Sequence, residues 1–79
     1  MNDRDQTRRA NLIAILRELA WDGVETLQGQ ARLLGAPAKV LHAIVIGKAM
    51  PDALAREIEW ATHKPMLWMD EAQPSHLHR

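Results

Sequence analysis

The sequence predicts an all-α domain, a compact bundle of about five short helices that contains a helix-turn-helix. Apolar residues recur at helical spacing in several segments, and no segment alternates apolar and polar residues as a half-buried strand would. A Gly-Ala-Pro turn separates two short helical patterns within residues 26–48. Gly35 suits the left-handed conformation that ends a helix, and Pro37 suits the opening position of the next.

The first helix is expected to begin near Asp3 or Asp5, because either carboxylate can accept a hydrogen bond from the free backbone N–H groups there. Asp22 and Gly23 form a turn signal that closes it, directly after Trp21. The helix carries one apolar stripe at helical spacing, which consists of Leu12, Ile15, Leu16 and Leu19.

The second helix is predicted over residues 26–34 and the third over residues 38–46, with Gly47 as the stop. Gly29 inside the second helix costs about 1 kcal/mol relative to alanine. The small side chain of Ala31 lets another helix approach closely. Both helices present apolar residues to one core, namely Leu27, Leu33, Leu34, Val40, Leu41, Ile44 and Val45.

Pro51 and Asp52 are expected to open a fourth helix, with the Asp52 carboxylate as its cap, and Pro65 to end it. The residues after Pro65 are apolar and are expected to fold back over the helices, which places Trp68 in the core. Residues 1–71 form the predicted domain, and residues 72–79 a flexible polar tail. The buried stripe of the fourth helix consists of Leu54, Ala55, Ile58 and Ala61.

Seventy-nine residues make one small domain, and the formal charge is zero. The charges are unevenly distributed, because residues 26–50 contain three basic residues and no acidic one. A chain without cysteine has no disulfide or thiolate chemistry, which fits a reducing cytoplasm. The sequence contains neither an apolar run long enough to span a bilayer nor a signal-peptide pattern, so a cytoplasmic location is expected.

Three motifs give the chain a resemblance to the Cro/repressor-like helix-turn-helix family, also called XRE-type regulators, over roughly residues 12–70. The first two fit A-x-x-L-G and L-x-x-(I/L)-x-x-G-K, and the third fits the ending A-R-x-I-E…P-x-x-W-(L/M)-D. The residues that carry them are Ala31, Leu34, Gly35, Leu41, Ile44, Gly47, Lys48, the run 55–59, Pro65, Trp68 and Asp70. The resemblance implies a lambda-repressor-like fold and a DNA-binding transcriptional regulator of the phage or mobile-element kind.

A short helix held across another by a tight turn can enter the major groove of double-stranded DNA. Lys39 and His42 are the expected hydrogen-bonding readers, and Ala38 and Ala43 can contact thymine methyl groups. Family members usually begin this helix with a serine or threonine cap and polar residues, whereas this chain has Pro-Ala-Lys-Val. The residues expected to contact phosphates are Gln28, Gln30 and Lys48.

Such a module reads few base pairs, so a repressor is expected to bind a pseudo-palindromic operator as a homodimer. The residues expected to form the dimer contact are Trp60, Met66, Leu67 and Met69. The competing interpretation is a protein-interaction module, antirepressor-like or antitoxin-like, which zero net charge and the apolar Ile46 favour. Catalysis, a cofactor and a metal site are not expected. The candidate metal ligands His63, His76 and His78 have no cysteine or carboxylate beside them at ligand spacing.

Overall fold

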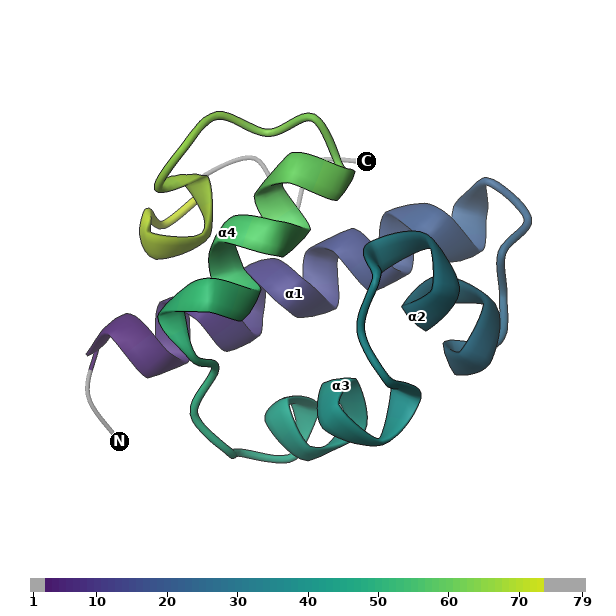
Figure 1. Cartoon of the computed structure of the whole chain (residues 1–79), viewed down its shortest axis with the longest axis horizontal. Helices are drawn as coiled ribbons and strands as arrows, with labels where there is room; N and C mark the ends of the chain where they lie inside the picture. The colour runs from purple at the N-terminus through teal and green to yellow at the C-terminus, as the bar shows by residue number, and fades with distance from the viewer. Residues whose placement is uncertain (1–2, 74–79) are drawn as a thin grey trace.

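The structure is a computed structural model, and it describes residues 3–73. These residues contain four α-helices and one single-turn 3-10 helix (Figure 1). No strand occurs in these residues, so the all-α prediction is confirmed. The first helix is long rather than short, with 19 residues, and the last helical element is a single turn. The elements are α1 (Asp3–Trp21), α2 (Leu27–Leu34), α3 (Ala38–Val45), α4 (Asp52–Ala61) and η1 (Trp68–Asp70).

The core lies where α1 runs across the molecule behind α2 and α4, with α3 below (Figure 1). The predicted stripes of α1 and α4 line this core, although Leu16 and Leu19 are only partly buried. The last residue of the α4 stripe, Ala61, is also only partly buried and lies outside the core cluster. Ala31 is buried, as the close approach of α2 to its neighbours requires. The largest fully buried side chains are Leu12, Ile15, Leu34, Leu41, Ile44, Ile58, Met69 and Asn11.

Two predicted core residues, Leu33 and Val40, are exposed instead. Each belongs to a helix of eight residues, and a two-turn helix turns only one narrow stripe inward. On α2 that stripe is taken by Leu34, which lies about 100° around the helix from Leu33. The prediction for these two side chains is therefore wrong.

Both predicted ends of α4 differ from those in the structure. The N-cap residue is Pro51, which makes no side-chain cap bond, and the Asp52 carboxylate instead lies 2.9 Å from Nη2 of Arg8. At the other end α4 stops at Ala61, four residues before Pro65, because His63 adopts the left-handed conformation with φ 59°. The backbone N–H of Lys64 then donates to the Glu59 carbonyl over 2.9 Å, which closes the helix end.

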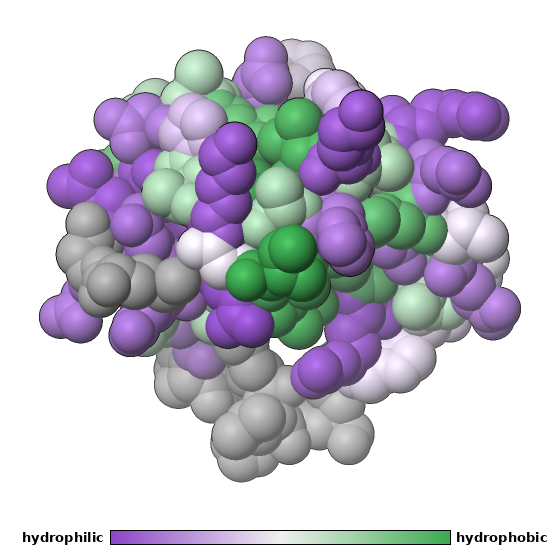
Figure 2. Space-filling model, turned by 90° about the horizontal axis from the view of Figure 1, so that it is seen from below, coloured by the Kyte–Doolittle hydropathy of each residue, from purple (hydrophilic) through white to green (hydrophobic). Residues whose placement is uncertain are grey.

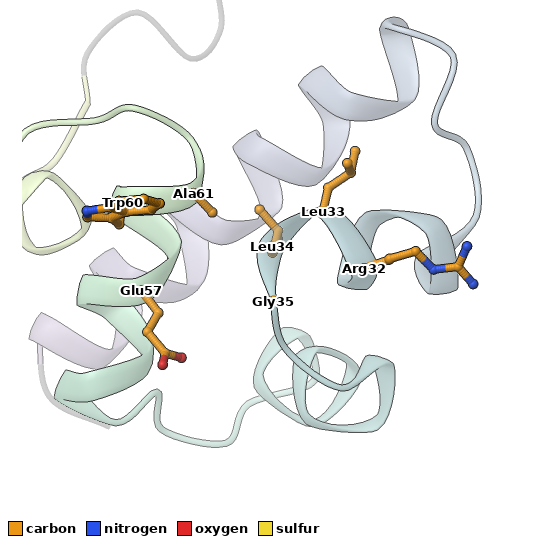
Figure 3. A pocket seen from close by; sticks show the side chains of 7 residues that line it. All are labelled: Arg32, Leu33, Leu34, Gly35, Glu57, Trp60 and Ala61. Carbon is orange, nitrogen blue, oxygen red and sulfur yellow. The ribbon is translucent and has the colours of Figure 1, made fainter.

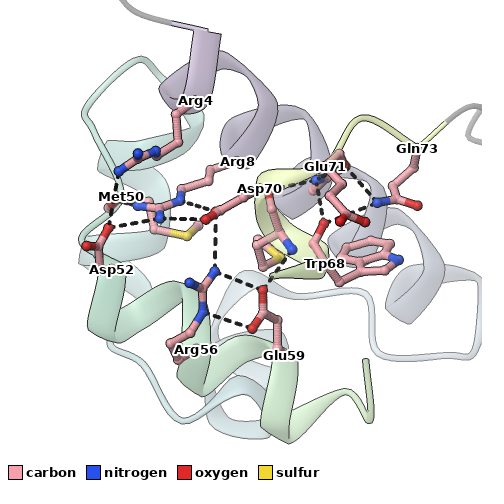
Figure 4. A network of polar contacts seen from close by, with 12 residues as sticks. Arg4, Arg8, Met50, Asp52, Arg56, Glu59, Trp68, Asp70, Glu71 and Gln73 are labelled. Carbon is pink, nitrogen blue, oxygen red and sulfur yellow. Dashed lines mark hydrogen bonds and ion pairs between the residues drawn. The ribbon is translucent and has the colours of Figure 1, made fainter. Parts of the chain in front are cut away.

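A partly buried ion-pair network fixes the C-terminal turn η1 against α1 and α4 (Figure 4). Arg8, only 2% exposed, donates two hydrogen bonds to the Asp70 carboxylate and one to the Met50 carbonyl over 2.8 Å. Arg56 donates to both oxygens of Glu59, at 2.9 and 3.0 Å, and lies 3.3 Å from Asp70. Hydrogen bonds from Arg8 lower the pKa of Asp70, against the opposing effect of burial.

Asn11 of α1 and Glu59 of α4 both hold the backbone of the same turn. Asn11 is fully buried, and its Nδ2 donates to the carbonyls of Met69 and Glu71, at 2.8 and 3.0 Å. The Glu59 carboxylate accepts from the backbone N–H of Met69 over 2.8 Å. Trp68, expected in the core, packs against it while remaining partly exposed.

The predicted flexible tail lies mostly outside the described residues. Of residues 72–79 the structure describes only the first two, Ala72 and Gln73. The Gln73 amide donates to the carbonyls of Trp68 and Glu71, at 3.1 and 2.7 Å, so the ordered domain extends at least to this residue.

Candidate nucleic-acid interface

The start of α2 is defined by a cap that packs closely against a glycine inside the helix. Thr26 is the N-cap residue, and its Oγ1 accepts a hydrogen bond from the Gly29 N–H over 3.1 Å. A Cβ at position 29 would lie only 3.1 Å from this Oγ1 and 3.2 Å from Cγ1 of Val24. Glycine therefore allows the close packing of the cap, which offsets its poor helix propensity.

Gln30, predicted to hold a phosphate, is buried and bonds within the protein. Its Nε2 donates to the Val24 carbonyl over 2.8 Å and to the Leu16 carbonyl over 3.2 Å. These bonds satisfy carbonyls of the α1–α2 connection and of α1 itself, so the side chain anchors α2. The prediction of a phosphate contact for Gln30 is wrong, because its amide is already occupied.

The turn between α2 and α3 is tight and depends on three consecutive residues. Gly35 has φ 73°, the left-handed conformation predicted for it, and ends α2. The N–H of Ala36 donates to the Ala31 carbonyl over 3.1 Å, and its methyl group is buried. Pro37, with φ −64°, is the N-cap residue of α3, whose first backbone bonds run to its carbonyl. The direction of α3 relative to α2 is thus fixed locally.

One side of α3 is anchored and the opposite side is free. Leu41 and Ile44 are fully buried, whereas Lys39 and His42 are exposed. The two alanines predicted to touch thymine methyl groups, Ala38 and Ala43, are partly buried, so they lie at the edge of the free side. Gln28 at the start of α2 and Lys48 after α3 are also exposed, as predicted.

Two apolar side chains share the outward surface with these polar residues. Val40 is exposed, and Ile46 is 70% exposed although it is strongly hydrophobic. Figure 2 shows the molecule from below, the side on which α3 lies in Figure 1, with a hydrophobic area surrounded by hydrophilic side chains. The exposed surface of α3 therefore combines polar and apolar side chains. Apolar side chains of this size are unfavourable in water, and they do not bind phosphate groups.

Arg9, an exposed residue of α1, adds a positive charge at the end of α3 that the sequence analysis did not identify. Its Nε donates to the carbonyl of Val45, the last residue of α3, over 2.6 Å, and its side chain is exposed. This contact uses Nε alone. The signal in the sequence was the Arg8-Arg9 pair: Arg8 continues the apolar stripe one turn before Leu12, which turns Arg9 outward.

The predicted dimer residues divide into two groups. Trp60, at 83% exposed, is an unusually open aromatic residue, and Met66 and Leu67 are exposed as well. Met69 is 0% exposed and belongs to the core, so its assignment to a dimer contact is wrong. The cause is η1, which turns Met69 inward while Met66 and Leu67, in the preceding loop, remain on the surface.

Neither a metal site nor a membrane span is found in the described part of the chain. Residues 3–73 contain no group of three or more His, Cys, Asp or Glu that could hold a metal ion. His63 is exposed, and His76 and His78 lie outside the described residues. No helix among the described residues has the length and apolar character that crossing a membrane requires.

Comparison with family models, with curated proteins and with solved structures gives no match. The resemblance to XRE-type regulators thus depends on motif residues alone. The structure gives the third motif a physical meaning, because its charged residues Arg56, Glu59 and Asp70 are joined in one network (Figure 4).

Proposed function

We propose that this protein is a sequence-specific DNA-binding transcriptional regulator, acting as a repressor on a pseudo-palindromic operator, with α2 and α3 as its helix-turn-helix. The observation that carries the proposal is the anchored and outward-facing α3. Leu41 and Ile44 hold it to the core while Lys39 and His42 point to solvent, and residues 26–50 contain no acidic group to repel phosphates. The lambda-repressor-like fold that the motifs imply belongs to the same proposal.

In this function the N-terminal half of α3 enters the major groove. The ammonium group of Lys39 donates to O6 or N7 of guanine, and the His42 imidazole forms a second hydrogen bond to a base edge. Ala38 and Ala43, at the rim of the exposed side, meet thymine methyl groups. With so few donors, the sequence-dependent shape of the DNA contributes to recognition as well.

The phosphates are held at both ends of the reading helix. Gln28 lies at the start of α2, where free backbone N–H groups also point outward. Lys48 follows α3, and Arg9 from α1 reaches the carbonyl at the end of α3. Contacts of this kind fix register on the duplex and carry no base information directly.

A single α3 reads few base pairs, so the repressor acts as a homodimer on two half-sites about 34 Å apart. The exposed apolar residues Trp60, Met66 and Leu67 are the contact that the sequence analysis predicted, with Met69 now excluded. They lie downstream of α3 and leave its outer side accessible.

Selection from a pool of randomised duplexes, followed by sequencing, tests the proposed function. The expected result is enrichment of an inverted repeat whose half-sites are one helical turn apart. A protein that enriches no sequence, or that retains duplexes without any preference, would contradict it. Competition with genomic fragments that contain inverted repeats provides the independent control.

The second candidate function is a protein-interaction module, antirepressor-like or antitoxin-like, and the exposed Val40 and Ile46 on α3 favour it. A variant with both residues changed to serine separates the two functions. If α3 binds protein, the double variant loses its partner while the Lys39→Ala variant keeps it. If α3 binds DNA, Lys39→Ala lowers the affinity for the operator more than the double serine variant does.

A further inference from the structure

A groove between α2 and α4 carries both a protruding aromatic residue and an apolar hollow (Figure 3). Trp60 stands on the α4 side, and its side chain is 83% exposed. On the α2 side lies Leu33, 54% exposed, and Leu34 and Ala61 form the floor between the two helices. Water contact with this much apolar surface is costly, so the groove is a candidate contact surface.

The charged residues of the groove have opposite signs and stand on opposite sides. Arg32 extends from α2 and Glu57 extends from α4, and both side chains are exposed (Figure 3). Neither forms an ion pair within the described part of the chain. A partner that satisfies both must present a carboxylate opposite α2 and a cation opposite α4.

We propose that the partner in this groove is a second copy of this chain, related by a two-fold axis. A two-fold axis brings the α4 side of one copy opposite the α2 side of the other. Each Trp60 then covers the partner's Leu33, and each Glu57 faces the partner's Arg32. The same patch supplies both the protruding group and the hollow, which is the self-complementarity that an isologous contact needs.

The placement of α3 selects the direction of the axis. In the views of Figures 1 and 3 the groove lies between α2 and α4, with α3 below it. An axis that runs from the groove toward α3 leaves both copies of α3 on the same side of the dimer. This inference deepens the dimer of the proposed function by moving its contact into the groove, which includes Trp60 but neither Met66 nor Leu67. It rests on that function only for the orientation of α3, and the contact itself requires no DNA.

The test is a charge exchange followed by sedimentation equilibrium without DNA, at protomer concentrations of about 1 to 100 µM. The parent protein is expected to be a dimer, and Arg32→Glu and Glu57→Arg are each expected to weaken it at least about tenfold. The double variant restores the opposite charges across the axis and should recover the parent dissociation constant. Trp60→Ala should weaken the dimer, whereas Trp21→Ala, also an exposed tryptophan, should not.

Circular dichroism melting curves confirm that each variant is folded before its mass is compared. A monomeric parent protein, an unchanged Trp60→Ala dimer, or a double variant that stays as weak as the single ones would overturn the contact. Failure of the proposed function has a different signature, a parent dimer that recognises no DNA sequence. A monomer that still binds an operator would overturn the contact and leave the function standing.

Discussion

Arg8 and Asp70 are 62 residues apart in the chain, yet the guanidinium of one donates two hydrogen bonds to the carboxylate of the other (Figure 4). Arg8 is almost completely buried, and its third bond, to the Met50 carbonyl, reaches the loop that follows α3. One side chain of α1 therefore positions both the C-terminal turn and the connection that leads away from α3.

The ion pair predicts a loss of stability in acid. The pKa of Asp70 is lowered chiefly by the hydrogen bonds from Arg8, and attraction to Arg8 and Arg56 adds to this, while burial opposes it. A carboxyl whose pKa is lower in the folded state contributes stability above its unfolded pKa, near about 4, and this contribution disappears as the pH falls through the folded pKa.

Urea unfolding at a series of pH values measures this contribution. Asp70→Asn is expected to be less stable than the parent protein at neutral pH, and the difference should shrink as the solution becomes more acidic. Glu25→Gln, at an exposed residue in the connection between α1 and α2, is the control and should follow the parent protein throughout. A constant difference between Asp70→Asn and the parent across the whole series would refute the prediction.

The readers on α3 are tested by Lys39→Ala and His42→Ala. Each is expected to weaken operator binding by about 1 to 3 kcal/mol and to relax the preference at particular base positions, because each removes a hydrogen bond to a base edge. Binding to a set of single-base operator variants gives the position dependence. Lys64→Ala is the matched control. Lys64 lies in the loop after α4, where its Nζ is 4.0 Å from a carboxylate oxygen of Glu18 in α1, so its loss should not affect DNA binding. Equal binding of every operator variant by parent and mutants would remove α3 as the reading element.

The phosphate contacts are tested by the salt dependence of binding. Lys48→Ala and Arg9→Ala should each weaken binding to all DNA sequences by the same factor. Each should also reduce the steepness of log affinity against log salt concentration by about one. Gln30→Ala should leave this slope unchanged and lower the unfolding free energy, because Gln30 bonds to Leu16 and Val24 within the protein. An unchanged slope for Arg9→Ala would limit Arg9 to its contact with the Val45 carbonyl.

Met69 and Met66 are a matched pair for testing the two sides of the C-terminal segment. Met69→Ala removes a fully buried side chain and should cost about 2 to 5 kcal/mol of unfolding free energy. Met66→Ala alters an exposed side chain three residues earlier, and at protomer concentrations well below the dimer dissociation constant it should change stability by less than about 0.5 kcal/mol. Thermal or urea unfolding measures the unfolding free energy of both variants. Equal decreases in this free energy would contradict the assignment of Met69 to the core.

The all-α architecture and the anchored side of α3 could be predicted because both depend on local patterns. Gly35 ended α2 as expected, and Leu41 and Ile44 turned inward at helical spacing. The exposure of Leu33 and Val40 could not be predicted in the same way. Hydrophobicity alone places such residues inside, whereas a two-turn helix has room for only part of its apolar residues at the core.

The errors in the candidate site arose from long-range contacts. Gln30 looked like a surface glutamine until α1 and its following loop supplied two carbonyl acceptors. Asp52 looked like a helix cap, but a buried cation 44 positions earlier in the chain attracts its carboxylate. A one-dimensional pattern contains no information about which carbonyl or guanidinium lies nearby in space, so these roles required the structure.

Asn11 and Arg8 also determine when this chain can fold during its synthesis. Their bonds to residues 69–71 form only after nearly every helix has been made and the last turn has left the ribosome. Until then Asn11 and Arg8 are polar groups facing an incomplete core, where an unpaired charge is strongly unfavourable. We therefore expect the ribosome-bound chain to stay protease-sensitive until residue 71 has emerged, and the domain to form in a single late step rather than helix by helix.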